Sequence, residues 1–172
     1  SGLSAPFVAV GIEEQTEIAF GLTAQGDVEF YGVKGQQAGK LLKASNIDIE
    51  GKITAFAKSA PHQGMFGYIT DQNELTVVKP FFRVSFPNDV RTLTPVINFP
   101  FGESAIEFGE NSTSQVSQFV FASEEESLGV LYQLENGKVM FSRLEGEEDM
   151  FTEEMAWTPY QSELNFVTGQ VK

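Results

Sequence analysis

Three segments of the chain repeat one layout, and this repeat limits the possible folds more than any other feature of the sequence. The segments lie near residues 7–44, 53–99 and 115–158. Each begins with a short apolar alternation, continues through a polar loop and ends in the pattern of a β-hairpin. The expected hairpin turns contain Gly26, Asn73 and Gly137, residue types that tolerate the positive φ of a tight turn.

Aligning these three turn residues also aligns Val8, Ala55 and Phe119, which lie equally far upstream in the opening strands. A strand, a loop and a hairpin at a period of about 45 residues is the layout of a WD40-like propeller blade. The sequence therefore predicts an all-β, partial β-propeller-like array of about three blades. We expect an outer, fourth strand of each unit from residues 39–44, 91–99 and 153–158. The alternative is a β-sandwich, which also shows hairpins at regular spacing.

Charge and composition exclude several classes of partner. The net charge is −13, so nucleic acid is not expected as a partner, because that binding depends on Lys and Arg neutralising phosphates. The chain has no cysteine, which excludes disulfides and thiolate metal sites. No apolar run approaches the length that spans a bilayer, so the fragment itself is not expected to cross a membrane.

The residues that could carry catalysis or bind a metal form weak patterns. His62 is the single histidine and falls in an expected loop, where it is typical of an exposed side chain. Residues 71–74 begin like a calcium loop but lack its later Gly and Glu, so we expect a plain hairpin turn there. Paired carboxylates of a glycosidase type are expected by chance among 24 acids. The sequence predicts no catalytic residue, no metal site and no cofactor.

One stretch is more specific: residues 82–95, followed by residues 99–103. It predicts a strand, a Pro-Asn-Asp turn and a second strand that ends in Thr-Pro. We expect Asn88 or Asp89 to bond the turn backbone, and Arg83 or Arg91 to pair with Asp89. The candidate interaction patch consists of Arg83, Pro87, Asn88, Asp89, Arg91, Thr94 and Pro95.

This stretch resembles the periplasmic insert of bacterial phosphate ABC transporter permeases of the PstC-like type. The shared run is Phe86-Pro-Asn-Asp-Val-Arg-Thr-Leu-Thr-Pro95 with Phe99-Pro-Phe-Gly-Glu103. The runs at residues 12–15 and 25–30 resemble the start of the same insert, so the likeness covers residues 12–108. It fades at residues 107–110, where family members tend to continue toward an acidic pair.

The resemblance implies that residues 1–172 are a single extracytoplasmic domain, a fragment of a larger insert. The parent would be an integral protein of the inner membrane that imports phosphate with a second permease subunit and a separate ATPase. The domain would lie on the periplasmic face and dock the phosphate-binding protein or another envelope protein, with no catalytic role. One alternative is a free-standing periplasmic propeller scaffold. Another is a propeller glycosidase that uses two acids in a central cleft beside Trp157 or tyrosines.

Phosphate itself is not expected to bind this acidic chain. Titration of the chain with millimolar phosphate should give no binding heat, because the net charge of −13 repels anions. Isothermal titration calorimetry measures this directly. A saturable isotherm would contradict the charge argument.

Overall fold

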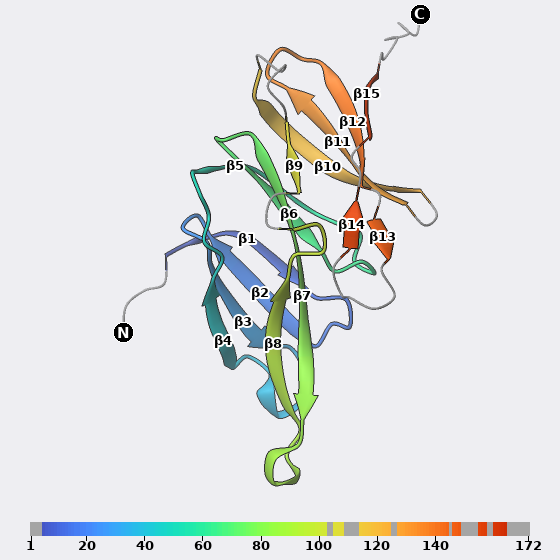
Figure 1. Cartoon of the computed structure of the whole chain (residues 1–172). Coiled ribbons are helices and arrows are strands. Elements are labelled where there is room, and N and C mark those ends of the chain that lie inside the picture. The colour runs from blue at the N-terminus through green and yellow to red at the C-terminus, as the bar shows by residue number, and fades with distance from the viewer. Residues whose placement is uncertain are drawn as a thin grey trace, which may run out of the picture.

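The computed structural model describes residues 5–102, 105–108, 114–124, 127–144, 146–148, 155–157 and 160–164. These residues form antiparallel β-sheets that follow one another along the chain (Figure 1). Two short 3₁₀ turns, η1 (Gly35–Gln37) and η2 (Pro87–Asp89), lie between strands. In this described part, no helix is long and apolar enough to span a membrane.

Three of the sheets are large, and we call them blades 1 to 3. In each blade the first three strands are hydrogen-bonded neighbours in the same order as in the chain. Blade 1 is β1 (Phe7–Ile12), β2 (Ile18–Thr23), β3 (Asp27–Gly32) and β4 (Leu41–Asn46). Blade 2 is β5 (Ile53–Lys58), β6 (Phe66–Thr70), β7 (Glu74–Ser85) and β8 (Thr92–Asn98), with β9 (Ile106–Glu107) also paired to β7. Blade 3 is β10 (Val116–Glu124), β11 (Ser127–Leu134), β12 (Val139–Leu144) and β15 (Tyr160–Leu164). A separate hairpin joins β13 (Gly146–Glu148) to β14 (Met155–Trp157).

The expected hairpin turns are confirmed. Gly26, Asn73 and Gly137 all have positive φ, at 86°, 62° and 86°. Each donates its backbone N–H to the carbonyl three residues earlier, at Thr23, Thr70 and Leu134 respectively. The second and third strands of the three blades are therefore in equivalent positions.

The first strands of the three blades also occupy equivalent positions. The residues that match one another differ, however, from those in the alignment expected from the sequence. In every blade the register between the first and second strands shifts near its start, between Phe7 and Ala9, Ile53 and Ala55, and Val116 and Gln118. This shift makes Ala9, Ala55 and Gln118 equivalent, whereas the sequence alignment matched Ala55 with Val8 and Phe119. The alignment was wrong by one residue in blades 1 and 3 because the equivalent residues Ala9, Ala55 and Gln118 lie 17, 18 and 19 residues before the turn residues, and not at one constant spacing.

The outer strands agree with expectation in two blades and differ in the third. β4 and β8 overlap the expected segments 39–44 and 91–99. In blade 3 the outer strand is β15, which pairs with β12, whereas β14 lies inside the expected segment 153–158 and pairs with β13. The remainder of that segment lies outside the described residues.

Successive blades pack face to face with the same polarity. We call the two faces of a blade forward and rear, where the forward face contacts the next blade along the chain. The first interface joins forward residues of blade 1 to rear residues of blade 2, among them Phe20, Leu22 and Phe30 with Phe66 and Tyr68. The second joins forward residues of blade 2 to rear residues of blade 3, among them Ile69, Leu75 and Val77 with Phe119 and Tyr132. By register, the rear residues of blades 2 and 3 occupy the same strand positions.

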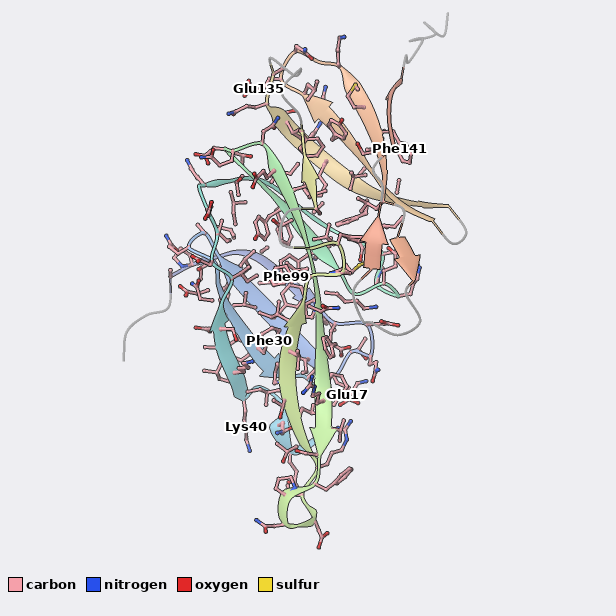
Figure 2. The ribbon with its side chains drawn as sticks, in the orientation of Figure 1. Glu17, Phe30, Lys40, Phe99, Glu135 and Phe141 are labelled. Carbon is pink, nitrogen blue, oxygen red and sulfur yellow. The ribbon has the colours of Figure 1, made fainter. Side chains whose placement is uncertain are left out.

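Aromatic rings fill the first interface. Phe66 is fully buried and stacks on Phe20 of the opposite sheet, with ring centroids 4.9 Å apart. Its ring also lies 5.7 Å from that of Phe56 on the neighbouring strand. Phe30 lies in the same core, and Figure 2 shows it among the side chains between the two blades. These Phe rings need no hydrogen-bond partner.

Replacing Phe66 tests whether this ring holds the blades together. Phe66→Ala should lower the free energy of unfolding by about 3–5 kcal/mol, because it leaves a cavity between two sheets. Phe86→Ala is the matched control, since Phe86 is 64% exposed and its loss should cost less than about 0.5 kcal/mol. Urea denaturation followed by tryptophan fluorescence or circular dichroism measures both values. Equal effects of the two substitutions would contradict the assigned core.

Candidate interaction site

The long strand β7 belongs to two pairings and thereby creates a projecting hairpin. Its first residues pair with β6, from Leu75 opposite Ile69 to Val78 opposite Phe66. From Lys79 to Ser85 it pairs with β8 instead. The β7–β8 ribbon thus extends beyond the rest of blade 2 and runs beside blade 1 (Figure 1). The short β9 takes the place beside the first part of β7.

The ribbon is fixed against blade 1 by polar and apolar contacts. Lys43 Nζ on β4 donates to the carbonyl of Pro95 at 3.2 Å. Arg91 Nη1 forms an ion pair with Glu17 Oε2 at 3.1 Å. Leu93 is buried in the core shared by blades 1 and 2, and Phe82 packs against that core. The hairpin is therefore part of the folded body along most of its length.

The end of the ribbon, the hairpin tip (residues 84–90), displays apolar side chains. Phe86, Val90 and Val84 are 64%, 53% and 43% exposed. Between them η2 closes the turn, with the Val90 N–H donating to the Pro87 carbonyl at 3.1 Å. Asn88 and Asp89 both have left-handed backbone conformations, with φ of 52° and 60°. Two consecutive residues other than Gly in this region are uncommon, and such strain is concentrated at functional sites.

The structure places the residues of the sequence-derived patch in different surroundings. Pro87, Asn88 and Asp89 lie at the exposed tip, and Arg83 lies opposite Thr94 on the exposed face of the ribbon. Pro95 is fully buried, so its inclusion in a surface patch was wrong.

Two expected contacts of the turn were also wrong. Arg91 pairs with Glu17 and not with Asp89, because the ribbon carries Arg91 back onto blade 1. The turn is closed by backbone atoms, and no side-chain capping bond is found at η2.

The apolar residues of the tip are the part of the site that sequence reasoning missed. Phe86 and Val84 continue the alternation of β7, which is typical of a core strand. Their exposure depends on where the ribbon leaves blade 1, and only the tertiary structure shows this. The feature of the sequence that could have indicated this exposure is their position just before a Pro-Asn-Asp turn.

The other residues considered as catalytic or metal-binding candidates lie in loops and turns of the fold. His62 is exposed in the loop between β5 and β6, as expected. Asn73 Nδ2 donates to the Phe108 carbonyl at 3.1 Å, and Asn73 Oδ1 accepts from the Val116 N–H at 3.0 Å. Asp71 Oδ1 accepts from the Lys52 N–H at 2.9 Å. Residues 71–74 therefore tie the turn to neighbouring segments. Within the described ranges, no three His, Cys, Asp or Glu residues are grouped as metal ligands.

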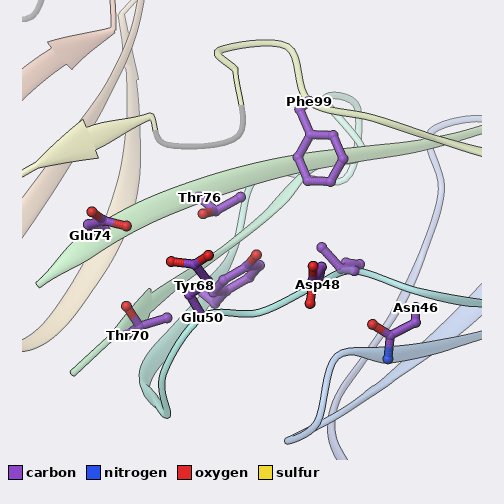
Figure 3. A pocket seen from close by; sticks show the side chains of 9 residues that line it. Asn46, Asp48, Glu50, Tyr68, Thr70, Glu74, Thr76 and Phe99 are labelled. Atoms are coloured by element: carbon purple, nitrogen blue, oxygen red, sulfur yellow. The ribbon is translucent and has the colours of Figure 1, made fainter. Parts of the chain in front are cut away.

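A pocket of about 520 Å³ lies where the linker after β4 passes blade 2. Figure 3 shows Asp48 and Glu50 on the linker, near Tyr68 of β6, with Glu74 at the opposite side and the ring of Phe99 above. Three carboxylates give this pocket a negative potential, which opposes the binding of anions such as phosphate. None of the described residues that line this pocket lies in the first strand of a blade, β1, β5 or β10.

Two phenols outside the hairpin have a raised pKa. The Tyr31 hydroxyl donates a hydrogen bond to the Glu29 carboxylate, and this bond raises the pKa of Tyr31. Burial raises the pKa of Tyr132 in the core between blades 2 and 3. Both side chains are therefore neutral at physiological pH.

Substitution of Asp89 tests the conformation of the turn. Asp89→Gly should be about 1 kcal/mol more stable than Asp89→Ala, because only Gly adopts a φ of 60° without steric cost. If a side-chain bond of Asp89 stabilised the turn, both variants would instead be less stable than the parent by similar amounts. Thermal and urea unfolding of the three proteins distinguishes these outcomes.

Comparison with known proteins identifies the fold. No family model matches the sequence, and no curated protein matches it. Among solved structures, the chain is similar to Hsv2 of Kluyveromyces lactis, with 12% identity, a TM-score of 0.53 and coverage of 94% of this chain and 48% of that one. It is also similar to Hsv2 of Kluyveromyces marxianus, with 9% identity, a TM-score of 0.50 and coverage of 95% and 48%.

These neighbours are β-propellers, and the chain spans about half their length. At this identity the likeness concerns the fold alone. The chain is an all-β, partial β-propeller-like array of three blades, and the sandwich alternative is set aside because the sheets succeed one another in chain order.

Proposed function

We infer that this chain is a non-catalytic interaction module, a propeller-type scaffold of the cell envelope whose contact point is the hairpin tip. The observation that carries the proposal is the exposure of Phe86, Val90 and Val84 at the end of a fixed ribbon. Large apolar side chains gathered at one exposed turn are typical of a protein contact site.

The construction of the ribbon favours binding. Because Lys43 and Arg91 hold the β7–β8 ribbon on blade 1, the tip is positioned before a partner arrives. A preorganised segment loses less conformational entropy on binding than a free loop does. The left-handed pair Asn88 and Asp89 bends the chain so that Phe86 and Val90 flank one turn. The matching surface on the partner is an apolar pocket with a polar rim.

The periplasmic insert of a phosphate permease is the second candidate function. The specific observation in its favour is that the run shared with that family, residues 86–95, forms the hairpin tip and the first part of β8. On this proposal the domain lies at the periplasmic face of the inner membrane and docks the phosphate-binding protein, while other subunits supply the channel and the ATPase. The acidic surface is compatible with a docking role that does not hold phosphate itself.

Photo-crosslinking from the tip tests the general proposal. A photoreactive phenylalanine analogue at position 86 should crosslink to one envelope protein, whereas the same analogue at position 120 should not. Val120 is the matched control because it is 55% exposed and lies on blade 3. Purified partner should then bind Phe86→Ser at least about tenfold more weakly than the parent, since a buried aromatic anchor contributes about 2 kcal/mol or more.

Two outcomes would count against these proposals. If Phe86→Ser binds the purified partner as tightly as the parent does, the tip is not the contact point. If the purified phosphate-binding protein gives no binding by calorimetry while another envelope protein does, the permease insert loses its support and the scaffold stands.

A further inference from the structure

The pocket of about 520 Å³ beside the linker after β4 is formed by three separate segments. One side is the rear face of blade 2. Tyr68 and Thr70 point to that face because they lie two residues apart on β6, and Thr76 lies opposite Tyr68 on β7. The linker after β4 and the ring of Phe99 form the other sides (Figure 3). None of residues 84–90 lines the pocket, so it is separate from the hairpin tip.

One buried polar group of this pocket has no partner. Thr70 is 5% exposed, and its hydroxyl oxygen Oγ1 forms no hydrogen bond within the described part of the chain. An unsatisfied buried hydroxyl destabilises a fold, so native structures contain few of them, and each one calls for an explanation. Figure 3 shows Thr70 among the side chains that line the pocket. A ligand that brings a hydrogen-bond donor would satisfy this oxygen.

The charge of the pocket determines the kind of ligand that it favours. Asp48 and Glu50 lie on the linker, and Glu74 lies at the opposite side, at the start of β7 (Figure 3). No ion pair among the described residues includes any of these three carboxylates. Their negative potential therefore attracts a cation into the pocket.

The surroundings favour an organic cation. Within the described ranges, no three carboxylates are grouped as ligands of a metal ion, and the volume is that of a site for a small organic molecule. Tyr68 and Phe99 add aromatic rings, whose faces attract cations and whose carbon surface packs against methylene groups. An aliphatic ammonium group combines a positive charge, three N–H donors and a carbon chain. It therefore complements the carboxylates, the Thr70 oxygen and the rings.

We propose that this pocket binds an aliphatic ammonium group, which donates to Thr70 Oγ1 and to the carboxylate of Glu74. Thr70 ends β6 and Glu74 begins β7, so one tight hairpin fixes the backbone of both acceptors. Asp48 and Glu50 contribute attraction from the linker. Free polyamines and the lysine side chains of peptides both carry such a group.

Calorimetric titration with putrescine tests the proposal. The expected result is saturable binding of one molecule per chain, whereas butanediol, the uncharged analogue of the same chain length, should give no heat. Glu74→Gln should weaken putrescine binding about threefold to fivefold, since it removes one ion pair. Glu135→Gln is the matched control, because it removes the same charge from the exposed turn between β11 and β12 (Figure 2). This control separates the pocket from the general attraction of amines to a chain of net charge −13.

Thr70→Val separates ligand binding from folding. Valine has the shape of threonine without the hydroxyl, so this variant should unfold at the same temperature as the parent or at a higher one, because no hydrogen bond is lost. It should nevertheless bind putrescine at least about tenfold more weakly, because the lost acceptor bonds a charged donor. Thermal unfolding with and without putrescine measures both effects, since a bound ligand raises the melting temperature.

A second probe identifies the source of the ammonium group. Nα-acetyl-lysine N-methylamide carries the same aliphatic ammonium chain on a peptide unit. Tighter binding of this compound than of putrescine supports a site for a lysine side chain of a peptide. Tighter binding of putrescine supports a site for a free polyamine.

Three results would overturn the inference. If neither amine binds, the pocket is not an ammonium site. If Glu135→Gln weakens binding as much as Glu74→Gln does, the amines are attracted by the acidic surface as a whole. If Thr70→Val binds putrescine as tightly as the parent does, the hydroxyl is not an acceptor for the ligand.

Discussion

The packing of one sheet face on the next is the interaction on which the rest of this structure depends. Each sheet alone would expose an apolar face, and the chain buries it by placing the forward side of one blade on the rear side of the next. Rings from the rear faces, such as Phe66 and Phe119, fill the space between sheets. The register between the first two strands shifts at the same place in every blade, so the residues that follow the shift occupy equivalent positions in all three.

The sequence contains enough local information to predict the hairpins but not their assembly. The turns at Gly26, Asn73 and Gly137 were predictable because backbone conformation depends on a few neighbouring residues. The alignment of the first strands was not, because the spacing between the first strand and the hairpin turn differs by one residue from blade to blade. The pairing of β12 with β15 joins segments far apart in the chain, and no local pattern specifies it.

The candidate site shows the same division between local and tertiary information. The Pro-Asn-Asp turn was predicted from its composition, but the partners of its charged residues were not. Arg91 reaches Glu17 because the ribbon lies along blade 1, and Pro95 is buried for the same reason. Phe86 has the sequence character of a core residue and becomes a surface feature only because β7 continues past the sheet that it helps to form.

The shared strand β7 also gives the molecule a defined mechanical axis. Its 12 residues span about 40 Å without interruption, from the centre of blade 2 to the base of the tip. Hydrogen bonds between antiparallel strands lie perpendicular to the strand direction. A pull on the tip along β7 would therefore load the bonds from β7 to β6 together, in shear, and not open them one after another. A partner that holds Phe86 would in this way exert its force on blade 2, the middle sheet of the array.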